Sequence, residues 1–325
     1  MGDIASLLLV AFGVGIVIGL TGMGGGALMT PALVFLGIPP TTAVANDLVA
    51  AAVNKSVGAA THLRHGSPNL KLAGLLIVGS VPTAAAGGWI ISQVGSAEEQ
   101  QTFVKLAIGV ALVLAAGTYV LRTFLNLRHK LRSVAEGSKH NNEPEVVRVI
   151  PTIIVGATGG LLVGLTSVGS GSLIMVALLM LYPRLAPNRL VGTDLVQAIP
   201  LVLAAAIGHV MYAGIDWAIL IPLIVGGSPG TYLGARLSSW VPQGVVRRGI
   251  AIVLALTGIG MLGLPSVWVG IAGAALLVLG PIFWGMVRKS HGLPPFADAT
   301  DEDLQAAAAR LPRPDRKPPA HSQHG

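Results

Sequence analysis

The stretch GLTGMGGG at residues 19–26 interrupts a long apolar run, and the stretch GLTSVGSG at residues 164–171 repeats it. An ordered series of further matches follows each copy: Asp47-Leu48-Val49 pairs with Asp194-Leu195-Val196, His62 with His209, and Gly79, Pro82 and Gly87 with Gly226, Pro229 and Gly234. The register shifts by two residues between the glycine stretch and the aspartate. Because chance matches would not keep this order, the series indicates an internal duplication. We name the two glycine stretches the first break and the second break.

The composition is that of a membrane protein. Hydrophobic residues make up 53% of the chain and charged residues only 11%, and the mean hydropathy is +0.74. Several apolar runs approach the roughly 20 residues that an α-helix needs to cross a bilayer. Such uninterrupted runs exclude a β-barrel, whose strands alternate apolar and polar residues over about ten positions. The sequence therefore predicts an all-α polytopic protein whose surroundings are the lipid bilayer.

Composition also excludes several kinds of chemistry. The chain contains no cysteine, so it has no disulfide, no thiol nucleophile and no cysteine-ligated metal. Its net charge of +7 comes mostly from basic residues between apolar segments, where membrane topology explains them. We therefore expect no nucleic-acid partner, no metal, no cofactor and no catalytic residue, and the sequence leaves the oligomeric state open.

The apolar segments divide the chain into two similar halves. In the first half (residues 1–125) they cover residues 1–20, 27–36, 42–63, 70–94 and 102–125, and in the second half (149–265) they cover residues 149–166, 173–182, 190–212, 217–240 and 245–264. The second segment of each half is too short to cross a bilayer, so each half opens with a glycine-broken pair of helices, either re-entrant or short. The remaining parts are a charged cytoplasmic connector (126–148), one additional span (266–288) and a mostly disordered cytoplasmic tail (289–325) with a short helix near residues 301–310.

Five segments is an odd number, so the second half is expected to lie inverted in the membrane relative to the first. The charges between segments agree with an inversion. Arg64 and Lys71 follow the third segment of the first half where the second half has Asp216, and Glu98 and Glu99 follow the fourth segment where the second half has Arg236, Arg247 and Arg248. The positive-inside rule then places the basic loops and the C-terminus in the cytoplasm and the N-terminus outside. We expect a multi-pass protein of a prokaryotic inner (plasma) membrane.

Matched breaks in inverted halves are typical of secondary transporters, whose sites lie near the membrane midplane. A broken helix exposes backbone N–H groups whose partial positive charge attracts anions, and glycine lets a substrate approach the backbone. We expect the following residues to bind a small anionic substrate: Thr21, Gly22, Gly24, Gly25, Gly26, Asn46, Thr166, Ser167, Gly169, Ser170, Gly171 and Thr193. The alternative is that these glycines serve only close helix crossing.

Asp47 and Asp194 lie in apolar segments, where ionisable residues are costly and usually functional. We interpret both as proton-coupling residues. On a helix, His62 shares a face with Asp47 and His209 shares one with Asp194, while Lys55 lies at the edge of the first face. These three residues are therefore additional candidates.

A second interpretation of the same residues is structural. Asn46 and Thr193 are good helix N-caps, which would place each following aspartate in the first turn of its helix. The two histidines would then lie at a membrane interface. The residues alone do not decide between the two interpretations.

The pattern GLTGMGGG, four further residues and Pro31 resembles the opening signature of the sulfite exporter TauE/SafE family of membrane anion permeases. In the second half, VGTDL at residues 191–195, His209, GIDW at 214–217 and GGSPG at 226–230 are also similar to that family. The resemblance covers residues 4–284 without the connector. It implies a transporter of small sulfur-containing anions such as sulfite, organosulfonates or sulfoacetate, moved in either direction. Many members have Gly-Thr-Ser where this chain has Gly192-Thr193-Asp194, and the carboxyl group there suggests proton coupling.

Other functions fit parts of this pattern. Glycine-lined breaks would also make a passive anion channel. Two membrane aspartates occur in intramembrane aspartyl proteases, but neither Asp47 nor Asp194 follows the Gly-x-Gly-Asp pattern that such proteases resemble. The first break lacks the lysine and Ser/Thr of a nucleotide-binding P-loop, so transport driven by ATP is not expected.

Overall fold

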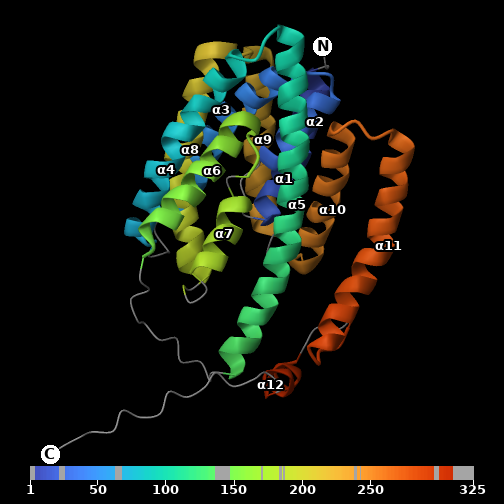
Figure 1. Cartoon of the computed structure of the whole chain (residues 1–325). Coiled ribbons are helices and arrows are strands. Elements are labelled where there is room, and N and C mark those ends of the chain that lie inside the picture. Colours follow the sequence, from blue (N-terminus) through green and yellow to red (C-terminus); the bar gives the residue numbers. More distant parts are fainter. Residues whose placement is uncertain are drawn as a thin grey trace, which may run out of the picture. The chain divides into compact units, whose positions relative to one another are not determined.

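The structure is a computed structural model of the 325-residue chain. It describes residues 4–21, 26–62, 68–135, 147–169, 171–182, 185, 187–237, 240–241, 243–295 and 300–309. Every regular element among these residues is an α-helix (Figure 1). The helices are α1 (Ile4–Thr21), α2 (Gly26–Phe35), α3 (Pro40–His62), α4 (Leu70–Ser92), α5 (Ala97–Ala135), α6 (Val149–Thr166), α7 (Leu173–Leu181), α8 (Pro187–Ala213), α9 (Trp217–Leu237), α10 (Gln243–Met261), α11 (Ser266–Ser290) and α12 (Asp301–Ala309). The expected all-α class is confirmed.

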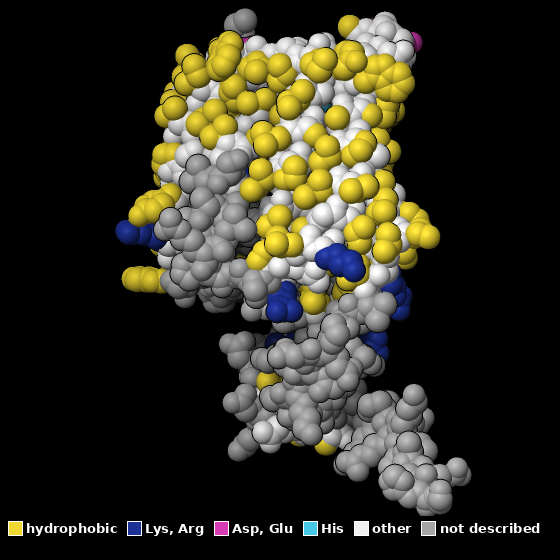
Figure 2. Space-filling view, turned by 90° about the vertical axis from the view of Figure 1, so that its left-hand side faces the viewer, with side chains coloured by type: hydrophobic (Ala, Val, Ile, Leu, Met, Phe, Trp, Pro, Cys, Tyr) yellow, Lys and Arg dark blue, Asp and Glu magenta, His cyan; other side chains and the backbone are white. Residues whose placement is uncertain are grey.

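The long helices are apolar enough to cross a bilayer. Among the described residues, six stretches meet the length and hydropathy of a span; they lie in α4, α5, α6, α8, α9 and α11. Large apolar side chains such as Leu9, Ile154 and Ile221 point outward, and apolar side chains are spread widely over the described part of the face that Figure 2 shows. Exposed apolar surface of this extent requires a hydrocarbon environment. The chain is a multi-pass membrane protein.

The chain forms two compact units. Unit 1 contains Met1–Thr123 and Pro144–Ala274, and so includes both glycine breaks. Unit 2 contains Phe124–Glu143 and Ala275–Gly325. Within unit 2, Leu131, Leu293, Leu304 and Ala307 form a small buried cluster. The short helix expected near residues 301–310 is α12, which contributes two of these buried side chains.

Some helices begin or end elsewhere than the apolar segments suggest. Helix α5 continues to Ala135, so ten residues of the expected connector are helical. Helices α3 and α8 begin at Pro40 and Pro187, earlier than expected. Proline suits the first position of a helix because its missing N–H would have no partner there and its φ angle is already helical. These early starts move Asp47 and Asp194 into helix interiors.

Glycines bring helices of the two halves into backbone contact. Gly15 and Gly19 of α1 lie against Gly227 and Thr231 of α9, and Gly160 and Gly164 of α6 lie against Ser80 and Ala84 of α4 in the same way. A Cβ atom at any of these four glycines would collide with backbone of the facing helix. In the register of the duplication, Gly15 corresponds to Gly160 and Gly19 to Gly164. The equivalent helices therefore make equivalent contacts, each with the other half.

A tight turn places α2 against α3. Gly37 has φ +84° and donates its N–H to Val34, while Ile38 donates to the carbonyl of Leu33. This is the Schellman pattern, which needs a residue with left-handed backbone, usually glycine, after the last helical turn. Pro40 then starts α3. The turn folds α2 back beside α3, so that Thr30 faces Asp47.

Candidate functional site

The second break is well described. Helix α6 ends at Thr166, and Ser167 follows in the left-handed region with φ 60°, donating its N–H to Val163 (2.8 Å). Gly169 also has positive φ, at 112°. A non-glycine residue with positive φ is uncommon and marks local strain, which proteins retain mainly at functional sites. Ser170 lies outside the described residues.

Helix α7 begins after this break without a side-chain cap. The side chain of Ser172, its N-cap residue, makes no capping hydrogen bond, although Leu173 donates to the carbonyl of Gly169 (3.3 Å). The first N–H groups of a helix have no partner within the helix and carry partial positive charge. The start of α7 can therefore attract an anion.

The first break can be placed only by its ends. Helix α1 ends at Thr21 and helix α2 begins at Gly26. Three residues expected to bind substrate, Gly22, Gly24 and Gly25, lie outside the described residues, and the structure does not describe the side-chain surroundings of Thr21.

Asp47 connects the first half to the second break. It is buried in α3 (3% exposed), and its Oδ2 accepts hydrogen bonds from Thr30 Oγ1 (2.5 Å) and Ser167 Oγ (2.8 Å). Thr30 belongs to α2, whereas Ser167 is the residue in the left-handed conformation after α6. A carboxylate buried in a membrane protein requires such donors. Three segments that are remote in the chain therefore meet at one carboxylate.

Asp194 is bonded within its own helix. It is buried in α8 (7% exposed), and its Oδ1 accepts from Gln197 Nε2 (3.0 Å). The preceding residue, Thr193, donates to the carbonyl of Arg189 (2.7 Å) and accepts from the N–H of Asn69 (3.0 Å). Thr193 thereby fastens α8 to the start of α4.

The N-cap interpretation of Asn46 and Thr193 is wrong. Asn46 lies in the second turn of α3 and donates Nδ2 to the carbonyl of Thr42 (2.9 Å), four residues earlier. Thr193 makes the corresponding bond to Arg189. Both residues are interior to helices that start at prolines, so neither aspartate lies in a first turn.

Two cationic side chains accompany the aspartates. Lys55 of α3 interacts electrostatically with both Asp47 and Asp194. Arg122 of α5 interacts with Asp194. The sequence did not single out Arg122, because membrane topology explains a basic residue near the end of an apolar segment. Its position inside the last apolar segment of the first half, before Leu125, was the available signal. The result is a cluster of two acidic and two basic side chains within the membrane helices.

Two buried amide oxygens beside this cluster have no donor. Asn46 Oδ1 and Gln197 Oε1 are inaccessible to solvent and make no hydrogen bond with any described residue. Each belongs to a side chain next to an aspartate, in sequence or through a hydrogen bond. Buried polar atoms are nearly always bonded, so the two oxygens are suited to a protonated group, a water molecule or a substrate hydroxyl.

Of the two candidate histidines, the structure describes the side chain of His209 but not that of His62. His209 is buried (1% exposed), and its Nε2 lies 2.5 Å from the carbonyl oxygen of Gly164 in the last turn of α6. It therefore lies against the second break rather than exposed at a membrane interface. The side chain of His62 lies outside the described residues.

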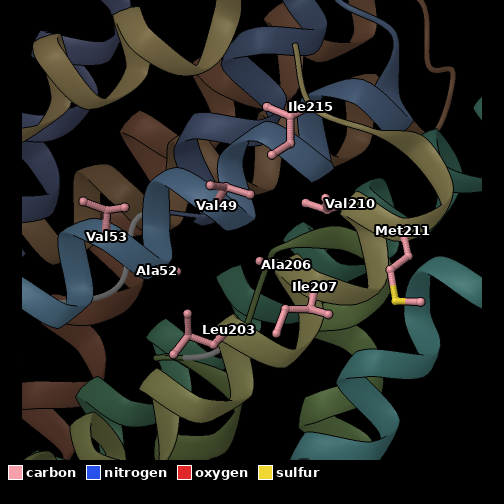
Figure 3. Close-up of a pocket in the computed structure, with 9 residues that line it drawn as sticks. All are labelled: Val49, Ala52, Val53, Leu203, Ala206, Ile207, Val210, Met211 and Ile215. Carbon is pink, nitrogen blue, oxygen red and sulfur yellow. The ribbon is translucent and has the colours of Figure 1, made fainter. Parts of the chain in front are cut away.

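A groove of about 610 Å³ lies between α3 and α8 (Figure 3). Its lining is entirely apolar: Val49, Ala52, Val53, Leu203, Ala206, Ile207, Val210, Met211 and Ile215. Helical periodicity places Val49 and Val53 on the face of α3 opposite to Asp47, and Leu203 and Ile207 opposite to Asp194. An anion would lose its hydration there without gaining a donor. We therefore place the candidate anion site at the breaks and not in this groove.

Comparison with known proteins gives a family over most of the chain. The family described as sulfite exporter TauE/SafE matches residues 7–261. The chain is similar to the probable membrane transporter protein YjnA of Bacillus subtilis (strain 168), with 34% identity over 258 residues that cover 79% of this chain and 99% of the relative. It is also similar to the probable membrane transporter protein YdhB of the same organism, with 28% identity over 257 residues that cover 79% of this chain and 99% of the relative. No solved structure matches.

Proposed function

The chain belongs to the sulfite exporter TauE/SafE family of membrane transporters, and we propose that it is a secondary transporter of small sulfur-containing anions such as sulfite or an organosulfonate. Membership in this family implies transport and not catalysis. The direction of net transport depends on the gradients of the anion and of its coupling ion. The proposal adds a mechanism: proton-coupled alternating access between two inverted halves.

The helix contacts support the inversion. Along α1, Gly15 and Gly19 meet Gly227 and Thr231 in the same chain direction, so α1 is parallel to α9; α4 is parallel to α6 by the corresponding contacts. Two copies that exchange equivalent helices in this way are related by a two-fold axis. With an odd number of segments in each copy, that axis lies in the membrane plane. Exchange of conformation between the copies would then open the site to alternate sides.

The anion site consists of the two breaks and the nearby cations. At the second break, Gly169, Ser170 and Gly171 would present backbone N–H donors in front of α7, whereas the hydroxyls of Thr166 and Ser167 donate to the carbonyl of Leu162 and to Asp47. At the first break, Thr21, Gly22, Gly24, Gly25 and Gly26 would contribute the equivalent groups, with Asn46 and Thr193 as flanking polar residues. Lys55 and Arg122 would balance the charge of the bound anion. Each contribution is electrostatic and gains strength from the low dielectric of the surroundings.

The single observation that carries the proposal is the cluster of two buried aspartates, Asp47 and Asp194, with Lys55 and Arg122, which interact with them electrostatically. Ionisable side chains within membrane helices are costly and mark ion pathways and proton relays. An anion that binds beside the cations adds negative charge to this cluster. Uptake of a proton by an aspartate compensates that charge, so anion and proton favour each other's binding. The expected coupling is therefore symport.

The distribution of charge supports the orientation with the N-terminus outside and the C-terminus in the cytoplasm. Basic residues lie at these helix ends: Lys71 in α4, Arg148 before α6, Arg189 in α8, Arg236 in α9 and Arg247 and Arg248 in α10. Acidic residues lie near the opposite ends: Glu98 and Glu99 in α5 and Asp216 before α9. The positive-inside rule assigns the first group to the cytoplasm of a prokaryotic plasma membrane.

The test is anion flux into proteoliposomes that contain the purified full-length chain. Sulfite and isethionate would be supplied with and without an imposed pH gradient. Saturable flux that increases when the gradient drives protons in the same direction is the expected result. Flux that does not saturate and does not depend on the pH gradient would indicate a passive channel and not a carrier. Absence of flux for both anions would overturn the proposed substrate class.

A further inference from the structure

The two aspartates occupy equivalent positions of the duplication but do not have equivalent surroundings. We propose that Asp194, together with Gln197, takes up and releases the coupling proton, whereas Asp47 is a latch that joins the two halves through Ser167. This inference rests on the proposed function and deepens it, because it assigns one site to the proton and another to the conformational change.

Asp47 receives its donors from other segments. Thr30 Oγ1 of α2 and Ser167 Oγ at the second break both bond to its Oδ2. Two hydroxyl donors compensate the burial of an ionised carboxylate in one fixed position. Because Ser167 is the strained residue between α6 and α7, any movement of the second break relative to α3 must break or remake this bond. The hydrogen bond of Asp47 therefore depends on the conformation of the other half.

The duplication does not provide Asp194 with the same donors. The residue equivalent to Ser167 is Gly22, which has no side chain. The residue equivalent to Thr30 is Met175 or Ala177, depending on which side of the two-residue register shift is counted, and neither can donate. The two halves therefore already differ in sequence at the positions that donate to Asp47.

Gln197 supplies what Asp194 needs in either protonation state. Its Nε2 donates to the carboxylate (3.0 Å), and its Oε1 is buried and makes no hydrogen bond with any described residue. When Asp194 carries a proton, rotation of the amide lets that O–H donate to Oε1 instead. One glutamine can thus satisfy both the charged and the neutral acid. At the equivalent position in the first half stands Ala50, whose methyl side chain cannot make such a bond with Asp47.

The charged neighbours also differ. Lys55 of α3 and Arg122 of α5 both interact with Asp194, whereas Asp47 interacts with Lys55 alone of these two. His209 lies on the same helix as Asp194 but bonds to Gly164. An anion that attracts Lys55 and Arg122 weakens the stabilisation that these cations give to the ionised carboxylate of Asp194. The carboxylate then takes a proton from a hydronium ion of the bulk solution, which is left as water.

The test compares variants that replace a residue by its counterpart in the other half. Gln197→Ala reproduces Ala50, and Ser167→Gly reproduces Gly22. These two variants, with Asp194→Asn and Asp47→Asn, would be assayed in proteoliposomes that contain a trapped pH-sensitive dye, with sulfite as the probe. Two quantities are measured: sulfite-dependent proton uptake, and exchange of labelled for unlabelled sulfite, which requires no net proton movement.

We expect Asp194→Asn to reduce proton uptake per sulfite roughly tenfold or more while exchange continues, since the site loses a titrating group but not its anion donors. Gln197→Ala should reduce the same ratio to a smaller extent. Asp47→Asn and Ser167→Gly should keep the ratio and change the exchange rate. If Asp194→Asn does not fold, the proton uptake per sulfite of Gln197→Ala tests the assignment of the coupling proton to Asp194.

Two results would overturn the assignment. One is a coupling ratio abolished by Asp47→Asn and retained by Asp194→Asn or Gln197→Ala. The other is an equal loss in both aspartate variants, which would make the halves equivalent. Failure of the proposed function is distinguishable, because the unmodified chain would then either exchange no sulfite or exchange it without any sulfite-dependent proton uptake.

Discussion

The hydroxyl of Ser167 donates a 2.8 Å hydrogen bond to Asp47 across 120 residues of chain. The bond joins the glycine break of one half to a membrane helix of the other, at the one described non-glycine residue with positive φ. Because both partners are buried, water cannot substitute for either. The relationship gives the second break a fixed position relative to α3 and makes Ser167 the most informative residue to change.

Two substitutions at Ser167 separate the hydrogen bond from the backbone strain. Ser167→Ala removes the hydroxyl and keeps a side chain in the left-handed region, whereas Ser167→Gly removes the hydroxyl and the strain together. Loss of a hydrogen bond to a buried charged group costs about 1.5–3 kcal/mol, and relief of the left-handed strain returns about 1 kcal/mol. We expect both variants to melt below the unmodified protein in detergent, with Ser167→Gly the more stable. The reverse order would show that the backbone at Ser167 is not strained.

Close helix packing predicts opposite effects for two glycines of α4. A Cβ at Gly79 would collide with the carbonyl oxygen of Ile153 in α6, whereas a Cβ at Gly74 would meet nothing within 4 Å. Gly79→Ala should therefore destabilise the protein by about 1–3 kcal/mol, the usual cost of overpacking. Gly74→Ala should be neutral or stabilise by up to about 1 kcal/mol, because alanine favours the helix. Thermal melts of the two variants side by side check this, and equal melting temperatures would contradict the contact.

Outside the membrane helices, Thr300 and Asp303 form a reciprocal cap at the start of α12. Asp303 Oδ2 accepts from Thr300 N (3.0 Å) and Thr300 Oγ1 (2.8 Å), and Thr300 Oγ1 accepts from Asp303 N (3.2 Å). The backbone N–H of Thr300, and then its hydroxyl, lower the pKa of Asp303 below its ordinary value of 3.8. Since the folded-state pKa is lowered, the contribution of this cap to α12 is complete at neutral pH and is lost as the pH falls through that pKa.

The measurement for this cap is a carbon NMR titration of the Asp303 carboxyl group in the full-length protein. Thr300→Ala removes the hydroxyl donor but not the N–H, so it should raise the pKa of Asp303 toward 3.8 without reaching it. Thr300→Ser keeps both donors and should leave the titration unchanged. An unchanged pKa in Thr300→Ala would exclude the side-chain bond.

The sequence predicts the equivalences of this fold but not its contacts. The duplication correctly identifies Asp47 and Asp194 as counterparts, yet it cannot reveal that Asp47 is bonded by Ser167, because a repeat relates residues to their copies and not to their neighbours. The N-cap interpretation failed for a local reason. Pro40 and Pro187 were available as helix starts, but the polar pairs Asn46-Asp47 and Thr193-Asp194 gave a more familiar signal.

Arg122 illustrates a further limit of the sequence. Its charge agrees with the positive-inside rule, so only its position inside the last apolar segment of the first half separates it from the topology-determining arginines. Only the packing of α5 brings it into electrostatic contact with Asp194. The same ambiguity holds for any basic residue within one or two turns of a span end, where topology and function make the same demand.

Arg122 gives the final prediction, which concerns substrate affinity. If it balances the charge of the bound anion, Arg122→Gln removes a charge-assisted interaction of about 1.5–3 kcal/mol, which corresponds to a roughly ten- to hundredfold rise in the KM for sulfite. The control is Arg248→Gln, because Arg248 is exposed and donates its Nε to Gly244 within its own helix (3.1 Å). Both variants remove one positive charge from the cytoplasmic group, so an effect on topology would appear in both. A rise in KM confined to Arg122→Gln assigns the residue to the anion site, whereas equal values for the two variants would return Arg122 to the topology-determining charges.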